Sequence, residues 1–388
     1  MSEILVISFS DLSRDPRVAR QIRLLSEHWS VTAAGLAEPA GDVDYVPLKA
    51  DAPAGAERLL PRGLRVLRSA LGRHERAYWE SSDIAHALTS LAGLRPRLIL
   101  ANEIAALPLA VRLAGGRSKV VFDAHEYAPG EWDDIWWWRA LYGPQAAHLC
   151  RRYIPQADAM TTVSQGIAER YAHEFGATPV VIRNAPAYAD LEPQPVGEAL
   201  RMVHFGWADA TRRLEEMIET VRFLDERFSL DLVLVKRDDA YLERLHRLAA
   251  DEPRIRFLPP VPMPELPAFA NAYDIGLYLL NATNFNRRYA LPNKFFEFVQ
   301  ARLAVAIGPS PEMASLVHRY GFGVVSQDHR PRSLADTLLR LDAEQVWQLK
   351  QRAHAAAPEL CAEREGERLL ELVDGLLGRP AALPIWPA

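Results

Sequence analysis

The sequence predicts an α/β protein made of two doubly wound, Rossmann-like domains. At 388 residues the chain is long for one hydrophobic core, so two domains of ordinary size are expected. Short apolar runs alternate with helical patterns in both halves, as in parallel sheets covered by helices on both faces. A proline-containing stretch with little apolar pattern, residues 186–200, separates the halves. We therefore expect domains at residues 1–185 and 201–358, followed by a helix and tail, 359–388, that either stays with the second domain or crosses back to the first.

The composition is that of an ordinary globular protein. Hydrophobic residues make up 49% and charged residues 24% of the chain, and the net charge of −5 leaves no basic footprint for nucleic acid. The two cysteines, Cys150 and Cys361, show no metal-ligand spacing and fit a reducing compartment. No signal-peptide pattern opens the chain, and the longest weakly polar stretch, residues 98–115, is too interrupted to span a bilayer. We expect a cytoplasmic protein that binds no nucleic acid.

The first domain opens with a strand–helix–strand unit. Residues 4–9 are continuously apolar, as in a strand buried on both faces, and a second strand is expected at 31–34. Between them, Asp15 and Pro16 make a good N-cap and first turn for a helix that ends near residue 28. The loop at residues 10–17 is expected at the carboxyl edge of the sheet, where ligands bind in such folds.

Residues 56–79 predict a helix in which arginines surround leucines. One interpretation is a solvated helix face, and the other is a basic amphipathic face that rests on an anionic membrane surface. The arginines are Arg62, Arg65, Arg68, Arg73 and Arg76, around Leu64, Leu67 and Leu71.

Further strands are expected at residues 97–100 and 120–122, and the second of these ends in the run Asp-Ala-His-Glu. His125 and its neighbouring carboxylates are therefore candidates for a site, although a lone histidine more often caps or satisfies a core. Four tryptophans follow, which serve either for packing, for stacking on sugars or for contact with a membrane interface. These are Trp132, Trp136, Trp137 and Trp138. The domain continues with a strand at 158–163, a helix to 175 and a strand at 180–182.

The second domain repeats the alternation without a sequence repeat. Its expected strands lie at 202–205, 230–235, 255–257, 275–279 and 304–308, with helices from about 211, 239, 264 and 292 and two more at 342–357 and 362–377.

The helix that begins at Pro292 carries the best candidate for an anion site. Its first turn offers backbone amides and a partial positive charge, which suit a phosphate. At 100° per residue, Phe295 lies on the apolar side, while Asn293 and Glu297 lie on the other, where Glu297 could accept hydrogen bonds from sugar hydroxyls. The alternative is an ordinary strand–helix junction, which any α/β protein contains.

Taken together in order, these motifs resemble those of retaining glycosyltransferases of family 4, which have the GT-B fold. The resemblance covers about residues 3–340 and rests on Asp123-Ala-His-Glu, Thr162-Val-Ser, Ile182-Arg-Asn-Ala-Pro and Pro292-Asn-Lys-Phe-Phe-Glu. It implies two domains that face each other across a cleft and a hexosyltransferase-type enzyme. Such an enzyme moves a sugar from a nucleotide-sugar donor to a glycan or lipid-linked acceptor, with no cofactor and no metal. The resemblance further implies a role in bacterial surface-polysaccharide assembly, with peripheral contact to an anionic inner membrane.

The resemblance also implies roles for individual residues. His125 would lie near the donor sugar and the reacting centre, Glu297 would bind the donor ribose, and Arg213 stands where the family usually has a lysine for the diphosphate. The donor phosphate and sugar would also contact Gly206, Arg212, Lys236, Asn293 and Lys294, and the acceptor side would include Arg14, Asp15, Arg17 and Glu126.

The chain departs from the family pattern at several positions. Tyr289 stands where the first of two glutamates is usual, Trp207 replaces an arginine, and Lys236 replaces a glycine. These departures leave two alternatives open: a nucleotide-sugar 2-epimerase on the same scaffold, and a non-catalytic partner that binds nucleotide-sugars. A dinucleotide oxidoreductase is disfavoured because no G-x-G-x-x-G follows the first strand.

Overall fold

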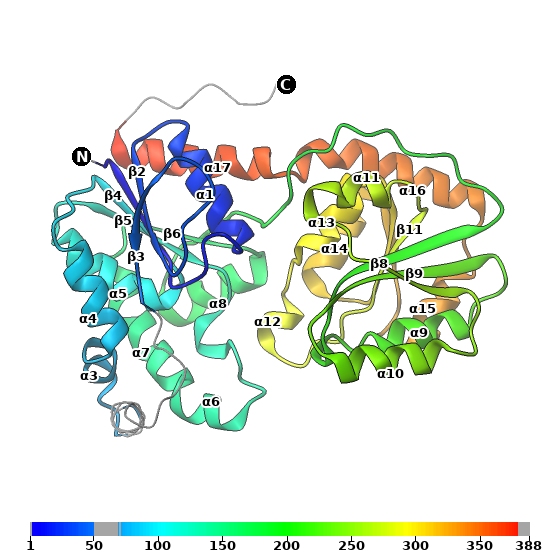
Figure 1. Cartoon of the computed structure of the whole chain (residues 1–388), viewed down its shortest axis with the longest axis horizontal. Helices are drawn as coiled ribbons and strands as arrows, with labels where there is room; N and C mark the ends of the chain where they lie inside the picture. The colour runs from blue at the N-terminus through cyan, green and yellow to red at the C-terminus, as the bar shows by residue number, and fades with distance from the viewer. Residues whose placement is uncertain (1, 50–68, 70, 379–388) are drawn as a thin grey trace. The chain divides into compact units, whose positions relative to one another are not determined.

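The computed structural model describes residues 2–49, 69 and 71–378, which form two compact units (Figure 1). The N-terminal unit contains the described residues up to Ile182, together with Asn284–Asn286 and the segment from Gly366. The C-terminal unit contains Arg183–Thr283 and Arg287–Glu365. Most of the expected basic helix at 56–79 lies outside the described residues, and the part that is described ends as α3 (His74–Trp79).

The N-terminal unit has a parallel sheet in the order β3-β2-β1-β4-β5-β6-β7. Its strands are β1 (Ile4–Ile7), β2 (Val31–Gly35), β3 (Asp44–Pro47), β4 (Leu98–Asn102), β5 (Lys119–Ala124), β6 (Ala159–Thr162) and β7 (Val180–Val181). Its helices are α1 (Pro16–Ser26), α3, α4 (Ser82–Leu91), α5 (Glu103–Ala114), α6 (Trp136–Leu141), α7 (Gly143–Tyr153) and α8 (Gln165–Phe175), with short 3₁₀ turns at Ala128–Gly130 and Ile154–Gln156.

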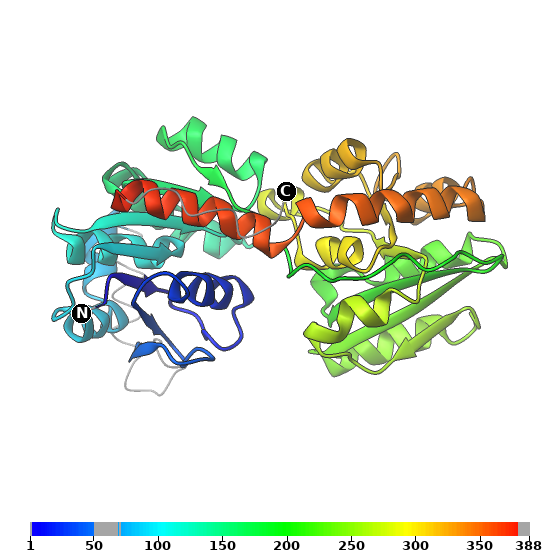
Figure 2. The same cartoon turned by 90° about the horizontal axis from the view of Figure 1, so that it is seen from above.

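Helix α1 begins as its sequence predicts. The Asp15 carboxylate accepts hydrogen bonds from the backbone amides of Arg17 and Val18, and Pro16 occupies the first helical position. The apolar side of α1 packs on β1 and β2 beside the last helix, α17 (Ala362–Leu377), which contributes Leu370 and Val373 to the same core (Figure 2). The C-terminal segment of the chain therefore completes the core of the N-terminal unit.

A buried ion pair joins α1 to β5. The Arg17 guanidinium donates to both carboxylate oxygens of Asp123, at 2.8 and 2.7 Å, and to the carbonyl of Ile182 at 2.8 Å. Gln21 and Thr161 donate to the same carboxylate, at 2.5 and 2.6 Å. Both charged side chains are buried, so their mutual attraction and these hydrogen bonds must offset a large desolvation cost.

The C-terminal unit has a second parallel sheet, in the order β10-β9-β8-β11-β12-β13. Its strands are β8 (Leu200–Ala208), β9 (Phe228–Lys236), β10 (Ile255–Leu258), β11 (Ile275–Tyr278), β12 (Ala304–Ile307) and β13 (Gly323–Val325). Its helices are α9 (Glu215–Arg222), α10 (Asp239–Ala249), α11 (Leu266–Ala270), α13 (Asn293–Gln300), α14 (Pro311–Tyr320), α15 (Pro331–Leu338) and α16 (Ala343–Ala356), with 3₁₀ turns at Ala210–Arg212, Met263–Glu265 and Ala357–Glu359. The short helix α12 (Phe285–Arg288) begins in the N-terminal unit and ends in the C-terminal one.

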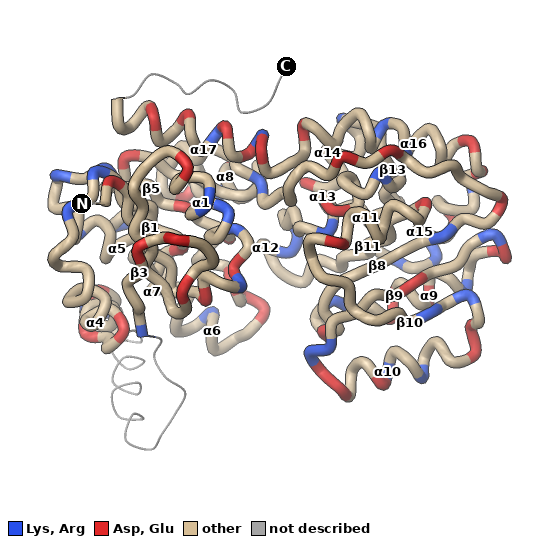
Figure 3. Tube along the Cα trace, turned by 45° about the horizontal axis from the view of Figure 1, so that its top comes forward, with Lys and Arg blue, Asp and Glu red and all other residues tan. Residues whose placement is uncertain are grey.

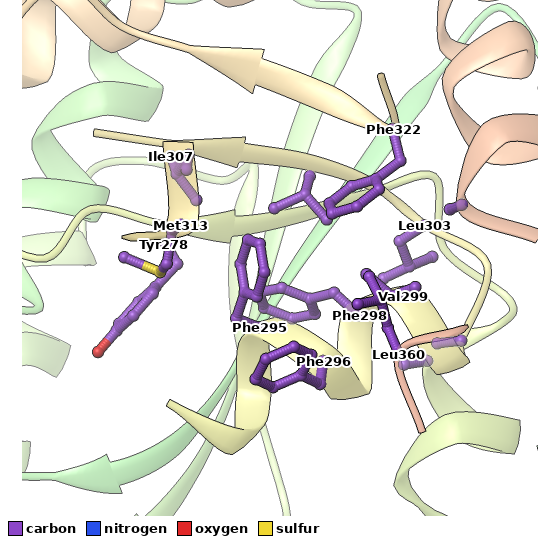
Figure 4. Packing of buried hydrophobic residues seen from close by; sticks show 14 of the residues in the cluster. Tyr278, Phe295, Phe296, Phe298, Val299, Leu303, Ile307, Met313, Phe322 and Leu360 are labelled. Atoms are coloured by element: carbon purple, nitrogen blue, oxygen red, sulfur yellow. The ribbon is translucent and has the colours of Figure 1, made fainter. Parts of the chain in front are cut away.

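Helices cover both faces of this sheet, so it has two cores (Figure 1). One core lies under α9, α10 and α15, and the other under α11, α13, α14 and α16. Helix α13 is central to the second core, where Phe295, Phe298 and Val299 are fully buried (Figure 4). A Cβ at Gly276 would lie 2.3 Å from the Phe298 ring, so this close approach of α13 to β11 requires glycine.

Three expectations for this unit are wrong in detail. The helix expected from residue 211 begins at Glu215, because Arg213 adopts a left-handed conformation (φ 50°) after the 3₁₀ turn. The expected polar face of α13 is not exposed to solvent. Glu297 is buried, and the Gln300 amide donates to the carbonyls of Ala357 and Leu360. Pro292 stands one position earlier than expected, as the N-cap of α13.

No helix among the described residues combines the length and the apolar character that crossing a bilayer requires. Basic and acidic residues are interspersed along the described parts of both units (Figure 3).

We predict that Arg17→Leu destabilises the N-terminal unit by about 3–5 kcal/mol, because the substitution leaves Asp123 buried without its countercharge. Urea denaturation followed by circular dichroism measures the shift of the midpoint. Arg14→Leu is the matched control, because the Arg14 side chain is 87% exposed and its contact with Asp11 spans 3.7 Å. Equal midpoints for the two variants would show that the Arg17–Asp123 pair does not stabilise this unit.

Candidate functional site

The candidate site in the C-terminal unit lies where the strand order reverses. Strands β8 and β11 are adjacent, but their crossover connections run to opposite sides of the sheet. Ligands in open parallel sheets bind outside the carboxyl ends of the strands at such a point. Here these ends carry Gly206 and Trp207 on β8 and Tyr278 on β11, and α13 contributes Lys294 from its first turn.

The Lys294 ammonium is held by aromatic and neutral groups. Its Nζ lies 3.3 Å from Nε2 of His204 and 4.8 Å from the centre of the Tyr278 ring. Within the part of the chain that the structure describes, no carboxylate forms an ion pair with Lys294. The Tyr278 ring lies at the edge of the aromatic core, with its hydroxyl directed away from the phenylalanines (Figure 4).

His204 accepts a hydrogen bond from Lys294 as a neutral imidazole. Its Nδ1 lies 2.9 Å from the carbonyl oxygen of Leu277, which can only accept, so Nδ1 carries the proton and Nε2 is free to accept. Burial and the nearby Lys294 charge hold the pKa of His204 well below its usual value, which agrees with this tautomer. Because His204 is fully buried, it fixes the direction in which Lys294 can point.

Gly206 makes room for the ammonium. A Cβ at this position would lie 2.5 Å from Nζ of Lys294, and the backbone φ of 144° disfavours any residue with a side chain. The glycine is therefore required both by its own conformation and by the position of Lys294.

The electrostatics of this cluster favour an anion. Burial, then repulsion from Arg212, lowers the pKa of Lys294 to about 7, although Glu297 acts in the opposite direction. Arg212 itself forms no ion pair within the described residues. Lys294, in the first turn of α13, thus has the Arg212 cation nearby, and neither side chain forms an ion pair among the described residues, although Glu297 acts on Lys294 and Asp209 on Arg212 from a longer range. A bound anion would relieve the repulsion between the two cations.

The structure separates the two arginines that sequence analysis placed together. Arg212 is partly buried and lies near Lys294, whereas the Arg213 guanidinium forms a 2.7 Å ion pair with Glu216. Lys236, at the end of β9, pairs with Asp239 at 2.8 Å and is largely exposed. Asn293 opens α13 beside Lys294, and Glu297 lies one turn further along the same helix.

In the N-terminal unit, His125 lies at the carboxyl end of β5 between acidic groups. Its Nδ1 is 3.3 Å from Glu103, and its Nε2 is 3.2 Å from Asp123 and 3.0 Å from the amide oxygen of Asn102. Burial opposes protonation, but the carboxylates of Glu103 and Asp123 outweigh it and raise the pKa of His125. The ring is therefore better suited to act as a hydrogen-bond donor or cation than as a base.

The predicted acceptor-side residues do not form one cluster. Arg17 is buried on Asp123, and Asp15 caps α1. Arg14 is exposed on the loop after β1. Glu126 accepts a hydrogen bond from the Asn286 amide, 3.2 Å away, within the same unit.

Three residues of these clusters could not be recognised from the sequence. His204 and Tyr278 look like ordinary strand residues in the sequence, since nothing there shows that adjacent strands bring them under Lys294. Glu103 stands out only in the structure, where its backbone has a left-handed φ of 65°. Its carboxylate accepts a hydrogen bond from the backbone amide of His125. Such strain in a non-glycine residue often marks a functional site.

No group of three or more His, Cys, Asp and Glu side chains in the described part of the chain has the arrangement of a metal site.

Several solved GT-B glycosyltransferases have a similar fold. HepE from Anabaena, solved in complex with UDP, superposes with a TM-score of 0.70 at 16% identity, covering 96% of this chain and all of its own. Sucrose-phosphate synthase from Thermosynechococcus elongatus gives a TM-score of 0.71 at 13% identity, covering 97% of this chain and 98% of its own. Trehalose 6-phosphate synthase from Burkholderia multivorans gives 0.65 at 13% identity, covering 99% of this chain and 100% of its own.

Neither a protein-family profile nor a curated protein matches the sequence. At these identities the likeness establishes the fold, which is GT-B.

We predict that Lys294 titrates near neutral pH. Competitive acetylation followed by mass spectrometry should give a midpoint of about 7 for Lys294. An unperturbed lysine would instead give a midpoint of roughly 10.4. A Lys294 midpoint near that unperturbed value would contradict the burial of its ammonium and its repulsion from Arg212.

Proposed function

We infer that this protein is a retaining, metal-independent glycosyltransferase, which moves a sugar from a nucleotide-sugar to a glycan or glycolipid acceptor. The observation that carries this proposal is the proximity of two cations, Lys294 in the first turn of α13 and Arg212 in the turn after β8, at the switch point of a GT-B sheet. When a sugar–phosphate bond breaks, negative charge develops on the leaving diphosphate. Fixed positive groups aimed at that charge accelerate the reaction.

The side chains and helix amides provide the charge that a divalent metal would otherwise supply, which supports a metal-independent reaction. Glu297 follows Lys294 by one turn, a spacing that suits one residue on the diphosphate and the other on the ribose. HepE was solved with UDP and with UDP-glucose, and its similar fold supports a uridine nucleotide as the donor. Retention of anomeric configuration, and a place in surface-polysaccharide assembly, follow from the sequence resemblance to family 4.

His125 is proposed to contact the donor sugar as a hydrogen-bond donor, without acting as the base. Both of its ring nitrogens face oxygen atoms, and its pKa is raised. The acceptor hydroxyl proton would then pass to the leaving phosphate as the new glycosidic bond forms. Arg14 and Glu126 are the proposed acceptor-side groups, whereas Arg17 acts through Asp123, which holds His125.

We predict that UDP binding weakens as the pH rises. The protonated form of Lys294 attracts the diphosphate, and this form is lost above its pKa of about 7. The Kd measured by calorimetry should therefore increase by about tenfold between pH 7 and pH 8.5. Lys294→Met should bind UDP more weakly at pH 7 and show little of this pH dependence, whereas Lys49→Met should behave like the parent protein. An unchanged slope in Lys294→Met would remove Lys294 from the diphosphate site.

We predict that Arg212 contributes more to sugar transfer than Arg213 does, because Arg213 is already paired with Glu216. With UDP-glucose as donor and a panel of alkyl glycosides as acceptors, mass spectrometry detects the addition of one hexose. Arg212→Ala should reduce the rate by roughly 10²-fold, and Arg213→Ala by less than about fivefold.

If Arg213→Ala lost more transfer activity than Arg212→Ala, then Arg213 would be the residue that binds the diphosphate, as the family resemblance indicates. If the parent protein binds UDP-glucose but transfers no hexose to any acceptor, it is a binding protein rather than an enzyme. Conversion of the donor to its 2-epimer would identify an epimerase.

A further inference from the structure

The N-terminal unit contains an apolar cavity that no assigned residue uses. It has a volume of about 230 Å³ and lies among α3, α4, α5, α6 and α7. Most of its walls are aliphatic or aromatic, and no residue predicted for the donor or the acceptor lines it. The apolar lining includes Tyr78, Ile84, Ile104, Trp138, Ala146 and Leu149.

One wall of the cavity belongs to the segments that hold His125. Ile104 follows Glu103, whose carboxylate accepts a hydrogen bond from the backbone amide of His125. Ala128, which also lines the cavity, lies three residues after His125. These residues stand at the carboxyl edge of the sheet, after β4 and β5. Glu126, a proposed acceptor-side group, is only two residues before Ala128, so the segment that carries it also forms part of the cavity wall.

The polar part of the lining consists of Ser81, Asp83, Glu131, Gln145 and the hydroxyls of Tyr78 and Tyr142. Oδ1 of Asp83 is buried and has no hydrogen-bond partner, although it lies in the first turn of α4 on the wall of the cavity. A buried acceptor without a donor is costly, so a ligand that brings a hydroxyl to this position would be favoured. The Tyr78 hydroxyl is already used, because it donates to the carbonyl of Ala105. The cavity thus suits an apolar group attached to a hydroxyl-bearing one.

The neighbouring surface also suits an amphiphile. Trp138 lines the cavity, while Trp136 and Trp137 on the same short helix are exposed, Trp136 by 75%. Tryptophan rings favour positions where one side is apolar and the other is wet. The cavity is too small for a whole lipid tail, since pockets for drug-sized ligands begin at roughly 300 Å³. A cavity of roughly 150 Å³ nevertheless accepts a benzene ring.

On the basis of the function proposed above, we propose that this cavity binds the beginning of an aliphatic chain on the glycosyl acceptor. The acceptor is then an amphiphile, with its sugar at the His125 edge and its first methylene groups against Ile104, Trp138 and Ala146. The apolar part of the acceptor supplies affinity, and its hydroxyl groups face Asp83.

Binding of n-octyl β-D-glucopyranoside, below its micelle concentration, tests this proposal against methyl β-D-glucopyranoside in calorimetry. The octyl glycoside should bind at least about tenfold more tightly, because several methylene groups leave water. Ala146→Phe and Ala77→Leu fill the cavity from α7 and α3 and should each remove this preference. Ala147→Phe, on the same helix but outside the lining, is the matched control and should keep it.

UDP affinity and the thermal midpoint are measured for every variant, so that a folding defect is recognised by loss of both. If one filling variant unfolds, the other still tests the site. Equal affinity for the two glycosides, or an octyl preference that survives both filling variants, would overturn the proposal. If the octyl preference persisted in both filling variants, the octyl group would instead bind to the exposed tryptophans Trp136 and Trp137. If the parent protein does not bind UDP, the glycosyltransferase proposal is contradicted, whatever the outcome of the glycoside comparison.

Discussion

The contact between the Lys294 ammonium and the neutral His204 ring determines the rest of the candidate donor site. A lysine in a partly buried position usually has a carboxylate partner, but here its nearest polar neighbour is a nitrogen that can only accept one hydrogen bond. This geometry requires that His204 stay unprotonated, that β8 have glycine at position 206, and that Tyr278 present its ring rather than its hydroxyl. Each requirement concerns a different strand or helix, so the site depends on the register of the whole sheet.

The two units differ in whether their buried or partly buried cations have a carboxylate partner. In the N-terminal unit, Arg17 is matched by Asp123, and Gln21 and Thr161 satisfy the remaining capacity of the carboxylate. In that cluster the positive charge of Arg17 is balanced by the negative charge of Asp123. The same carboxylate contacts His125 and so helps to position its ring. In the C-terminal unit, Lys294 and Arg212 face each other's charge without such a partner. The first arrangement is suited to holding a structure together, and the second to receiving an anion.

The sequence predicted the fold class and most of the inner strands, because buried parallel strands appear as continuous apolar runs. It also predicted the capped start of α1. It did not predict β3, an exposed edge strand whose residues lack an apolar run, or α5, whose sequence is apolar on nearly all sides. The start of α9 was misplaced because Arg213 adopts a left-handed conformation that sequence propensity does not favour.

The candidate site could be predicted only in part for a related reason. Lys294, Glu297 and Gly206 belong to recognisable local patterns, so the sequence indicated them. His204 and Tyr278 join the site through the pairing of β8 with β11, which links residues more than 70 positions apart. The difference between Arg212 and Arg213 depends on one backbone conformation, and neither composition nor helical periodicity reports it.

The energetic cost of the Lys294 cluster is itself an argument for function. Bringing two cations together in a partly buried place destabilises the folded chain, and a carboxylate or an apolar residue at position 294 would avoid that cost. Sequences are usually consistent with their fold at every level, and the positions that break this rule tend to be functional. Lys294 is such a position, because a neighbouring cation lowers its pKa and it lies at the edge of the sheet where ligands bind. A doubly charged ligand would convert the repulsion between Lys294 and Arg212 into attraction, so the cluster is unfavourable only while the anion is absent.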